Sequence, residues 1–237
     1  YEMPESLQPV LYEKVREREE FDENQLPMHM VFWGTPLDDF WKIEDSKLKL
    51  RCIRQRLDDE LQPMKMDGNL KYDRYTAFVG RRQCAVNVMV TARMRFIAKN
   101  NESAGIAAVQ AMNHQLHVER ALEDGKQVLK AVVTTAEYDR PPYFPGFEGQ
   151  TNRQIIASVP WEQEEIILQI EMKGEDFVIR YGEKEGTLQM LCKMDGSVIN
   201  PEKVGCMCGT LLGMYATGNG EDSENIAEFD WFSYREF

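Results

Sequence analysis

Hydrophobic and polar residues alternate most regularly between residues 86 and 96. One parity carries Val86, Val88, Val90, Ala92, Met94 and Phe96, and the other carries Asn87, Thr91, Arg93 and Arg95, with Met89 as the exception. Successive side chains of a β-strand point to opposite faces of a sheet, so this period of two predicts a long strand. Because only one face is apolar, we expect an antiparallel sheet with one solvated face.

The stretch from residue 213 to residue 234 predicts two further strands and a turn. Residues 213–217 run into Gly218-Asn219-Gly220, and glycine and asparagine accept the positive φ angles that such turns need. Residues 227–234 alternate, which places Phe229, Trp231 and Ser233 on one face and Asp230, Phe232 and Tyr234 on the other. Since both faces carry aromatic residues, we expect a strand buried on both sides, with Phe229 and Trp231 in the core.

Short strand-like segments follow one another along the rest of the chain. They are residues 48–52, 128–134, 155–159, 166–172, 177–181 and 188–192, and turn signals such as Asp124-Gly125 separate them. We find no convincing long helix between them. This spacing predicts an all-β protein, an antiparallel two-sheet β-sandwich of the jelly-roll class.

The beginning of the chain differs in composition from the rest. Residues 1–19 are polar and charged, include Pro4 and Pro9, and have little apolar periodicity. We therefore expect residues 1–19 to be a linker or extension laid over a surface, and residues 20–237 to be the folded sandwich. The chain starts at Tyr1 rather than at methionine, so we also expect a cut or processed N-terminus and a place in the rear part of a larger protein.

Composition and charge narrow the classes of partner. Of the 237 residues, 43% are hydrophobic, which suffices for a core, and the formal net charge is −12. Nucleic acids and anionic membranes attract clusters of lysine and arginine, so we expect neither as a partner. No apolar run approaches the length of a membrane span. The five cysteines are irregularly spaced, so we expect no disulfide framework, and no metal site at Cys206 and Cys208.

Three motif blocks resemble a known family. They are Phe78-Val79-Gly80-Arg81-Arg82-Gln83, the segment Glu102-Ser103-Ala104-Gly105 with the Asn113-His114 turn that follows, and residues 213–220 with Phe229-Asp230-Trp231-Phe232-Ser233-Tyr234. Together they resemble the C-terminal concanavalin A-like β-sandwich of glycoside hydrolase family 43, the β-xylosidases and α-L-arabinofuranosidases. The resemblance extends over residues 20–237, and residues 138–149 look like an insertion relative to it.

The resemblance implies an accessory part of an enzyme rather than a catalytic one. In family 43 the acid, the base and a third, pKa-tuning carboxylate belong to a catalytic propeller, and no position of this chain inherits them. We therefore expect a domain that stabilises a propeller and shapes or binds its xylo- or arabino-oligosaccharide substrate. The alternatives are a stand-alone lectin-like carbohydrate-binding protein and, third, a glycoside hydrolase in its own right.

Eight residues are candidates for carbohydrate binding: Trp33, Arg81, Arg82, Gln83, His114, Tyr143, Phe144 and Phe147. Guanidinium and amide groups offer paired donors to sugar hydroxyls, and exposed rings stack on the apolar face of a pyranose. Alternatively, residues 81–83 tie the sandwich to a neighbouring domain or a buried carboxylate, and the aromatic loop packs as a lid. His114 and His117 lie three apart, on opposite faces of a strand, so we expect no shared metal.

Two further expectations concern an interface residue and a metal. In relatives, an aromatic residue of the loop before residues 211–217 reaches the mouth of the active site, and Met207 stands at that place here. Methionine packs against a sugar or a propeller surface, but it does not stack as a ring does. Sandwiches of this class often hold a structural calcium ion near the chain ends, and Asp22 and Asp230 are the candidate ligands. We expect no other cofactor.

Overall fold

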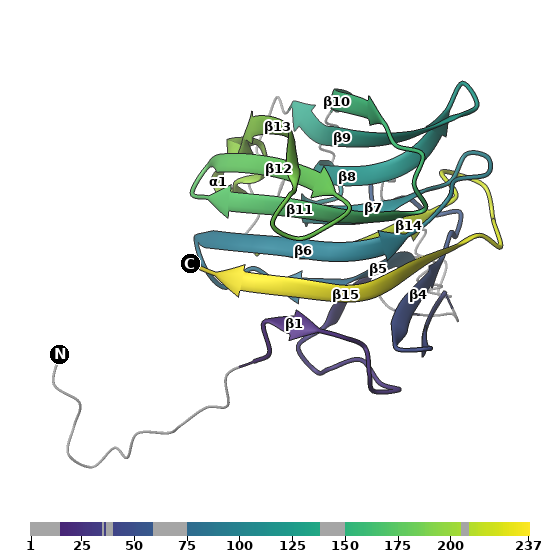
Figure 1. Cartoon of the computed structure of the whole chain (residues 1–237). Coiled ribbons are helices and arrows are strands. Elements are labelled where there is room, and N and C mark those ends of the chain that lie inside the picture. Colours follow the sequence, from purple (N-terminus) through teal and green to yellow (C-terminus); the bar gives the residue numbers. More distant parts are fainter. Residues whose placement is uncertain (1–14, 35, 37–39, 59–74, 138–149, 205–208) are drawn as a thin grey trace, which may run out of the picture.

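The computed structural model describes residues 15–34, 36, 40–58, 75–137, 150–204 and 209–237. Within these residues the chain forms two antiparallel sheets, which confirms the predicted β-sandwich (Figure 1). Helix is limited there to two single turns, η1 (Gly196–Ile199) and α1 (Pro201–Val204). No helix in this described part is long and apolar enough to cross a membrane.

Sheet A faces the viewer in Figure 1 and has the strand order β13-β12-β11-β6-β15-β4-β3. The short strand β1 pairs with the part of the β15 edge that β4 leaves uncovered. The strands of sheet A are β1 (Arg18–Glu19), β3 (Trp41–Glu44), β4 (Lys47–Arg51), β6 (Asn87–Arg95), β11 (Glu165–Lys173), β12 (Asp176–Gly182), β13 (Gln189–Asp195) and β15 (Ile226–Glu236). Six predicted strands, including residues 86–96 and 227–234, thus lie in this sheet.

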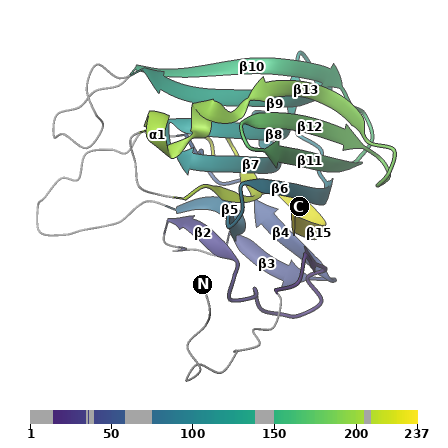
Figure 2. The same ribbon diagram turned by 90° about the vertical axis from the view of Figure 1, so that its left-hand side faces the viewer.

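Sheet B has the strand order β10-β9-β8-β7-β14-β5-β2. Its strands are β2 (Val31–Gly34), β5 (Tyr75–Arg82), β7 (Ser103–Ala111), β8 (His114–Glu123), β9 (Lys126–Glu137), β10 (Gln150–Pro160) and β14 (Leu211–Thr217). The edge strands β10 and β13 of the two sheets lie along the same margin of the sandwich (Figure 2). The tight turn between β8 and β9 has positive φ at Asp124 and Gly125, as the sequence predicts.

The core lies between the two sheets, and β6 illustrates why. Val88, Val90, Ala92 and Met94 are fully buried in it, whereas Arg93 and Arg95 point to the solvated face of sheet A. This confirms the predicted alternation, except that Val86 lies before the strand and is exposed. β6 pairs with β11 along one edge and with β15 along the other, and its apolar face is buried in the core between the sheets.

The strand β15 corrects one prediction. Phe229, Phe232 and Tyr234 belong to the core between the sheets, but Trp231 does not. The register against β6 shifts between Phe229 and Trp231, so Asp230 is the extra residue of a β-bulge. One extra residue reverses the side to which every later side chain points. Trp231 is therefore buried on the outer face of sheet A, beneath Arg18, and not beside Phe229 in the core.

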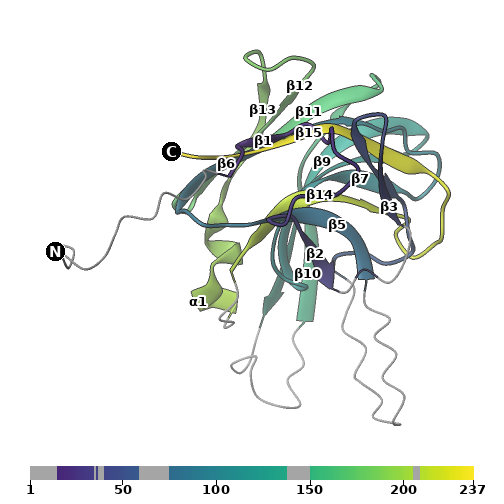
Figure 3. The ribbon, with the colours of Figure 1, turned by 90° about the horizontal axis from the view of Figure 1, so that it is seen from below.

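Residues 15–21 form a strap that runs along the sandwich before β2. Arg81 of sheet B donates a hydrogen bond to the carbonyl of Arg16, and the amide of Tyr234 in sheet A donates to the carbonyl of Glu17. Arg18 and Glu19 then pair with β15, beside which β1 is seen in Figure 3. The strap thus contacts both sheets, and its last residue, Phe21, is buried in the core.

Candidate functional site

Three of the predicted carbohydrate-binding residues lie at one end of sheet B. Arg82, the last residue of β5, pairs with Leu211, the first residue of β14. The backbone amide of Gln83 donates to the carbonyl of Thr210, whose hydroxyl donates to Gln110 Oε1 at 2.6 Å. His114 opens β8 at the same end, opposite Ala111. The ends of β5, β14, β7 and β8 therefore bring together residues that are distant in the sequence.

The side chains at this end differ in what they offer a ligand. Arg82 is exposed, and the side-chain amide of Gln83 donates to the carbonyl of Ala85. His114 is buried, and its Nδ1 lies 3.1 Å from Asn113 Oδ1. Burial lowers the pKa of His114 from its ordinary value, because desolvation disfavours the charged imidazolium. Arg82 is thus the charged group with the freest access to solvent.

Arg81 and Trp33 lie away from this group. Arg81 packs over the ring of Tyr234, with its Cζ 4.4 Å from the ring centroid, and holds the strap through the carbonyl of Arg16. Trp33 is partly buried against an apolar cluster on the outer face of sheet B. Its buried members are Leu57, Phe78, Ala107, Val109, Leu211 and Tyr215. The candidates Tyr143, Phe144, Phe147 and Met207 lie outside the described residues.

A buried polar network lies beside that apolar cluster. Tyr215 donates a short hydrogen bond to Glu119 Oε2, and Arg153 Nη2 donates to Glu119 Oε1 at 3.2 Å. The same guanidinium also reaches Asp58, with 3.4 Å between Nε and Oδ2, and Thr134 donates to that oxygen. Arg153 therefore bridges Glu119 of β8 and Asp58.

The surroundings of Glu119 keep it ionised. Burial alone would raise its pKa, but the neighbouring imidazole of His117 and the charges of Arg153 and Lys130 outweigh burial and hold the pKa well below its usual range. Burial and this carboxylate together raise the pKa of Tyr215 well above its ordinary value, so the phenol stays protonated and donates. His117 lies on this outer face, with its ring 5.0 Å from the ring of Tyr215, whereas its neighbours Leu116 and Val118 face the core. By alternation His114 lies on the face opposite to His117, as predicted.

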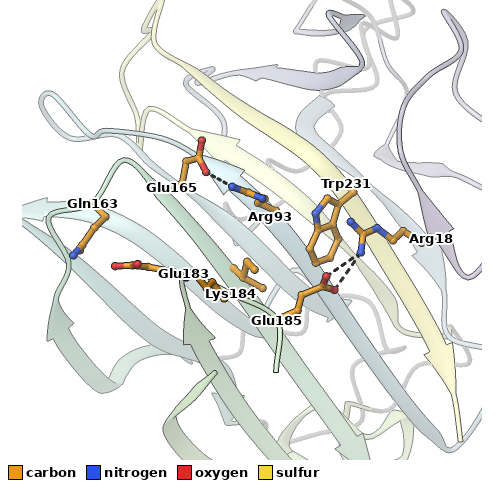
Figure 4. Close-up of a pocket in the computed structure, with 9 residues that line it drawn as sticks. Arg18, Arg93, Gln163, Glu165, Glu183, Lys184, Glu185 and Trp231 are labelled. Atoms are coloured by element: carbon orange, nitrogen blue, oxygen red, sulfur yellow. Dashed lines mark hydrogen bonds and ion pairs between the residues drawn. The ribbon is translucent and has the colours of Figure 1, made fainter. Parts of the chain in front are cut away.

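A groove of about 590 Å³ lies on the outer face of sheet A. Arg18, Arg93, Gln163, Glu165, Ile167, Glu183, Lys184, Glu185 and Trp231 line it. Arg18 covers the indole of Trp231, with its Cζ 3.8 Å from the ring centroid, and Nη1 of Arg18 donates to both oxygens of Glu185 at 3.2 Å. Figure 4 shows this stack on one side of the groove and the Arg93–Glu165 ion pair on the other.

The surroundings of the two candidate calcium ligands do not fit that ion. Asp22 is exposed just after β1, and Asp230 lines a smaller hollow together with Lys47, Arg93, Arg95, Glu165 and Glu228. The three cations of this hollow balance its three carboxylates, so it offers no excess negative charge to a metal cation. In the described residues no group of three or more histidine, cysteine, aspartate or glutamate side chains is placed to hold a metal. Calcium at this pair stays a prediction that this arrangement does not support.

Sequence reasoning missed both the network and the groove. Part of the signal is local, because β8 mixes polar residues such as His117 and Glu119 with apolar ones, and a charged residue in a strand is rarely buried without partners. The partners Asp58, Arg153 and Tyr215 come from other elements, so only the register of the sheet reveals them. The groove depends on the bulge at Asp230, which the sequence does not mark.

Two curated proteins resemble this chain over most of its length. A non-reducing end α-L-arabinofuranosidase, BoGH43B, from Bacteroides ovatus is 25% identical over 219 residues, which are 92% of this chain and 37% of that protein. A xylosidase/arabinosidase from Butyrivibrio fibrisolvens is 26% identical over 219 residues, which are 91% of this chain and 37% of that protein. The chain thus spans well under half the length of these relatives.

Solved structures share the fold. A Bacteroides ovatus protein described as Xyloglucan PUL GH43B superposes with a TM-score of 0.76 at 22% identity, over 98% of this chain and 42% of that one. The GH43 protein BlXynB from Bacillus licheniformis superposes with a TM-score of 0.77 at 18% identity, over 97% of this chain and 41% of that one.

A family model assigns the chain more directly. The model described as "Beta xylosidase C-terminal Concanavalin A-like domain" matches residues 18–235, from the first residue of β1 to the penultimate residue of β15. This match covers both sheets, and the motif blocks that suggested the family lie in β5, β7, β14 and β15. The chain belongs to the concanavalin A-like domains found at the C-terminus of β-xylosidases in glycoside hydrolase family 43.

Proposed function

We propose that this chain is the accessory, non-catalytic domain of a family 43 glycosidase. It stabilises a catalytic propeller, in the same or a separate chain, and it shapes or binds the xylo- or arabino-oligosaccharide that the propeller cleaves. The observation that carries the proposal is the family match over residues 18–235. The curated relatives, which are described as an arabinofuranosidase and as a xylosidase/arabinosidase, are far longer than this chain. Their additional length leaves room for a separate catalytic domain.

Two of the buried carboxylates of the described residues, Glu119 and Glu102, support a non-catalytic role. Glycoside hydrolysis needs a general acid whose pKa is raised, opposite a base or nucleophile. The pKa of Glu119 is instead lowered, and its oxygens accept from Tyr215, Ser103 and Arg153. Glu102 is likewise engaged, with the backbone amides of Lys99 and Asn100 and with Ser223. Both carboxylates hold the fold together and do not face a substrate.

The end of sheet B supports the part of the proposal that concerns the substrate. Arg82 is exposed there and its guanidinium carries N–H donors, Gln110 and Thr210 lie beside it, and β14 begins at the same end. We propose that this end faces the propeller and meets either its surface or the sugar. β9 ends at Glu137 and β10 begins at Gln150 at this end as well.

A calorimetric titration of the chain with xylohexaose and with linear arabinohexaose tests the binding half of the proposal. We expect saturable binding that Arg82→Ala weakens about tenfold, because a charged hydrogen bond contributes about 1.5–3 kcal/mol. Arg235→Ala is the matched control, since Arg235 is also an exposed arginine at a strand end but lies in sheet A. Equal affinity in both variants would remove the end of sheet B from the proposal.

A comparison of the propeller with and without this domain tests the structural half. The propeller, in the same or a separate chain, is measured in the presence and in the absence of residues 18–237, and we expect it to unfold at a lower temperature and to lose activity without them. Met207→Ala in the complete protein should raise KM if this residue lies at the substrate entrance. An unchanged melting temperature and unchanged kinetics in the absence of residues 18–237 would contradict an accessory role.

A further inference from the structure

The groove on sheet A differs from the end of sheet B in place and in chemistry. Its floor is formed by β6, β11 and β15, and its rim by β1 and by the turn after β12. Its volume of about 590 Å³ falls in the range of small-ligand sites, which is about 300–1,000 Å³. It is an open groove, so a chain-like ligand can enter without a conformational change.

The charged side chains of the groove are held in place before any ligand arrives. Arg18 lies flat on Trp231 and is fixed by Glu185 through Nη1 and by Glu20 through Nε, at 3.2 and 2.7 Å. Arg93 is fixed by Glu165, whose Oε2 accepts from Nη2 at 2.5 Å. Side chains that are already ordered lose little entropy on binding, so these contacts preorganise the groove.

Among the described residues, these ion pairs leave donors and acceptors available. A guanidinium group carries five N–H donors, and in these pairs Arg18 engages Nη1 and Nε whereas Arg93 engages Nη2. Glu165 accepts from Arg93 with one of its two oxygens. The groove therefore presents N–H donors beside carboxylate acceptors, which is the pattern that a row of sugar hydroxyls matches, because each hydroxyl both donates and accepts.

The charge of the groove argues for a neutral ligand. Arg18, Arg93 and Lys184 are balanced by Glu165, Glu183 and Glu185. A phosphate or an acidic peptide would meet the carboxylates, and a basic peptide would meet the cations, so either would suffer repulsion. A neutral, hydroxyl-rich chain has no such penalty and can use both kinds of group.

We propose that this groove is a second carbohydrate-binding surface, separate from the end of sheet B, that binds a neutral oligosaccharide through hydrogen bonds from Arg18, Arg93 and Glu165. The class of the ligand, a xylo- or arabino-oligosaccharide, rests on the proposed function. The location of its binding site rests on the groove. Because the indole of Trp231 is covered by Arg18, the ligand meets the guanidinium edge and not the indole face. Such a surface would hold the domain on a polysaccharide while the propeller acts elsewhere on it.

Nuclear magnetic resonance titration of the ¹⁵N-labelled chain with xylohexaose and with linear arabinohexaose tests this inference. The indole N–H of Trp231, assigned through Trp231→Phe, reports on the groove. We expect this resonance to shift saturably with one of the two oligosaccharides. Arg93→Ala should raise the dissociation constant measured from this resonance about tenfold, because it removes a charged hydrogen-bond donor.

Arg95→Ala is the matched control. Arg95 lies two residues further along β6, is similarly exposed and makes the same kind of ion pair, with Glu164, but it does not line the groove. Arg95→Ala should change the dissociation constant by no more than about twofold, because Arg95 lies outside the groove and an exposed ion pair contributes little to stability. Glu165→Gln keeps the shape of the side chain and separates the loss of the acceptor from a loss of folding.

The outcomes separate the two proposals. A weakening with Arg93→Ala and not with Arg95→Ala supports the groove. If Trp231 does not respond while Arg82→Ala abolishes calorimetric binding, the groove is excluded and the proposed function stands. If neither oligosaccharide binds at millimolar concentration, the groove is excluded together with the binding half of the proposed function, and only the stabilisation of the propeller is left to test.

Discussion

At the scale of single residues, Glu119 is the group on which the outer face of sheet B depends most. Its carboxylate accepts from Tyr215, Ser103 and Arg153 and has Lys130 within 3.7 Å. Breaking a buried ion pair from one side leaves its partners desolvated and uncompensated. The cost of removing this one charge should therefore exceed that of removing an exposed carboxylate.

We predict that Glu119→Gln lowers the free energy of unfolding by about 3 kcal/mol, because Arg153 and Lys130 lose a buried partner. Glu123→Gln is the control, since Glu123 lies on the same strand and pairs with Lys130 at 3.0 Å but has a side chain that is 40% exposed. Its cost should stay below about 1 kcal/mol. Urea denaturation of both variants checks the prediction, and equal costs would mean that burial at Glu119 does not matter.

Acid should destabilise the chain in two separate pH ranges. The pKa of His114 is lowered by burial, and that of His29 is lowered by burial and by Arg81 against the opposing effect of Glu19. The two histidines therefore bind protons less tightly in the folded state than in the unfolded state. Their contribution to the free energy of unfolding is complete above the unfolded-state pKa of about 6.5 and declines below it. Glu119, whose folded pKa is depressed, contributes stability above its unfolded pKa of about 4.3, and this is lost at lower pH.

Unfolding midpoints in urea, measured from pH 8 to pH 3, test this pH dependence. His114→Gln should flatten the decline between about pH 7 and pH 5.5, and Glu119→Gln should flatten the decline below about pH 4.5. A double variant of His29 and His114 that keeps the full decline between pH 7 and pH 5.5 would show that other groups cause it.

At the scale of strands, β5 and β14 approach each other closely. Gly80 and Gly213 face each other across this pair. A Cβ atom added at Gly213 would lie 2.4 Å from the carbonyl oxygen of Val79 and 2.5 Å from Cα of Gly80. These are backbone atoms of a central strand pair, so they cannot move aside without disturbing the ladder.

We predict that Gly213→Ala destabilises the sandwich by about 1–3 kcal/mol or more through overpacking. Gly209→Ala is the matched control, because Gly209 precedes the same strand and an added Cβ there meets nothing within 4 Å. Thermal unfolding followed by circular dichroism at the β-sheet wavelength compares the two. If both variants melt at the wild-type temperature, the two strands can accommodate an added methyl group and the prediction is wrong.

The strands themselves are also the scale at which sequence reasoning works best. Alternation predicts β6 because each core position is apolar and each outer position is polar or long, and turn chemistry predicts the end of β14, where Asn219 and Gly220 adopt positive φ. The motif Arg81-Arg82-Gln83 is predicted to bind carbohydrate or to tie the sandwich to a neighbouring domain or a buried carboxylate, and this stays a prediction. The structure adds that Arg81 ties the strap to the sandwich whereas Arg82 faces solvent.

Sequence reasoning fails where one residue breaks the period. The bulge at Asp230 requires no glycine and has no compositional signal, yet it moves Trp231 from the expected core to the groove. The network around Glu119 is invisible for another reason, since Asp58, Arg153 and Tyr215 are dispersed over the chain and meet only through sheet register. The site therefore needs the structure even though the fold does not.

At the scale of the whole molecule, the strap closes the sandwich along the β15 margin. It contacts sheet A through the β1 pairing and sheet B through Arg81, and it covers Trp231 with Arg18. Glu19 of the strap is buried and lies 2.9 Å from His29 Nε2. A segment with these contacts is part of the folded unit, consistent with the family match that begins at residue 18.

We predict that deleting residues 1–19 lowers the free energy of unfolding by about 3 kcal/mol, because several hydrogen bonds of about 1 kcal/mol each and the Arg18–Trp231 contact are lost. Calorimetry gives the value, and a red shift of tryptophan fluorescence in the deletion variant would report the uncovering of Trp231. Identical melting temperatures would mean that the strap merely rests on the surface.

The order of strands has a consequence for how the protein is made. β14 lies between β7 and β5 in sheet B, and β15 lies between β6 and β4 in sheet A, so each sheet has a gap that residues 211–236 must fill. Synthesis runs from the N-terminus, and a domain generally folds as a unit once its residues are available. Neither sheet can therefore close on the ribosome before residue 236 has emerged. A stop codon anywhere upstream of β14 would release two split sheets with unpaired edges, a product that quality control would degrade rather than a smaller working domain.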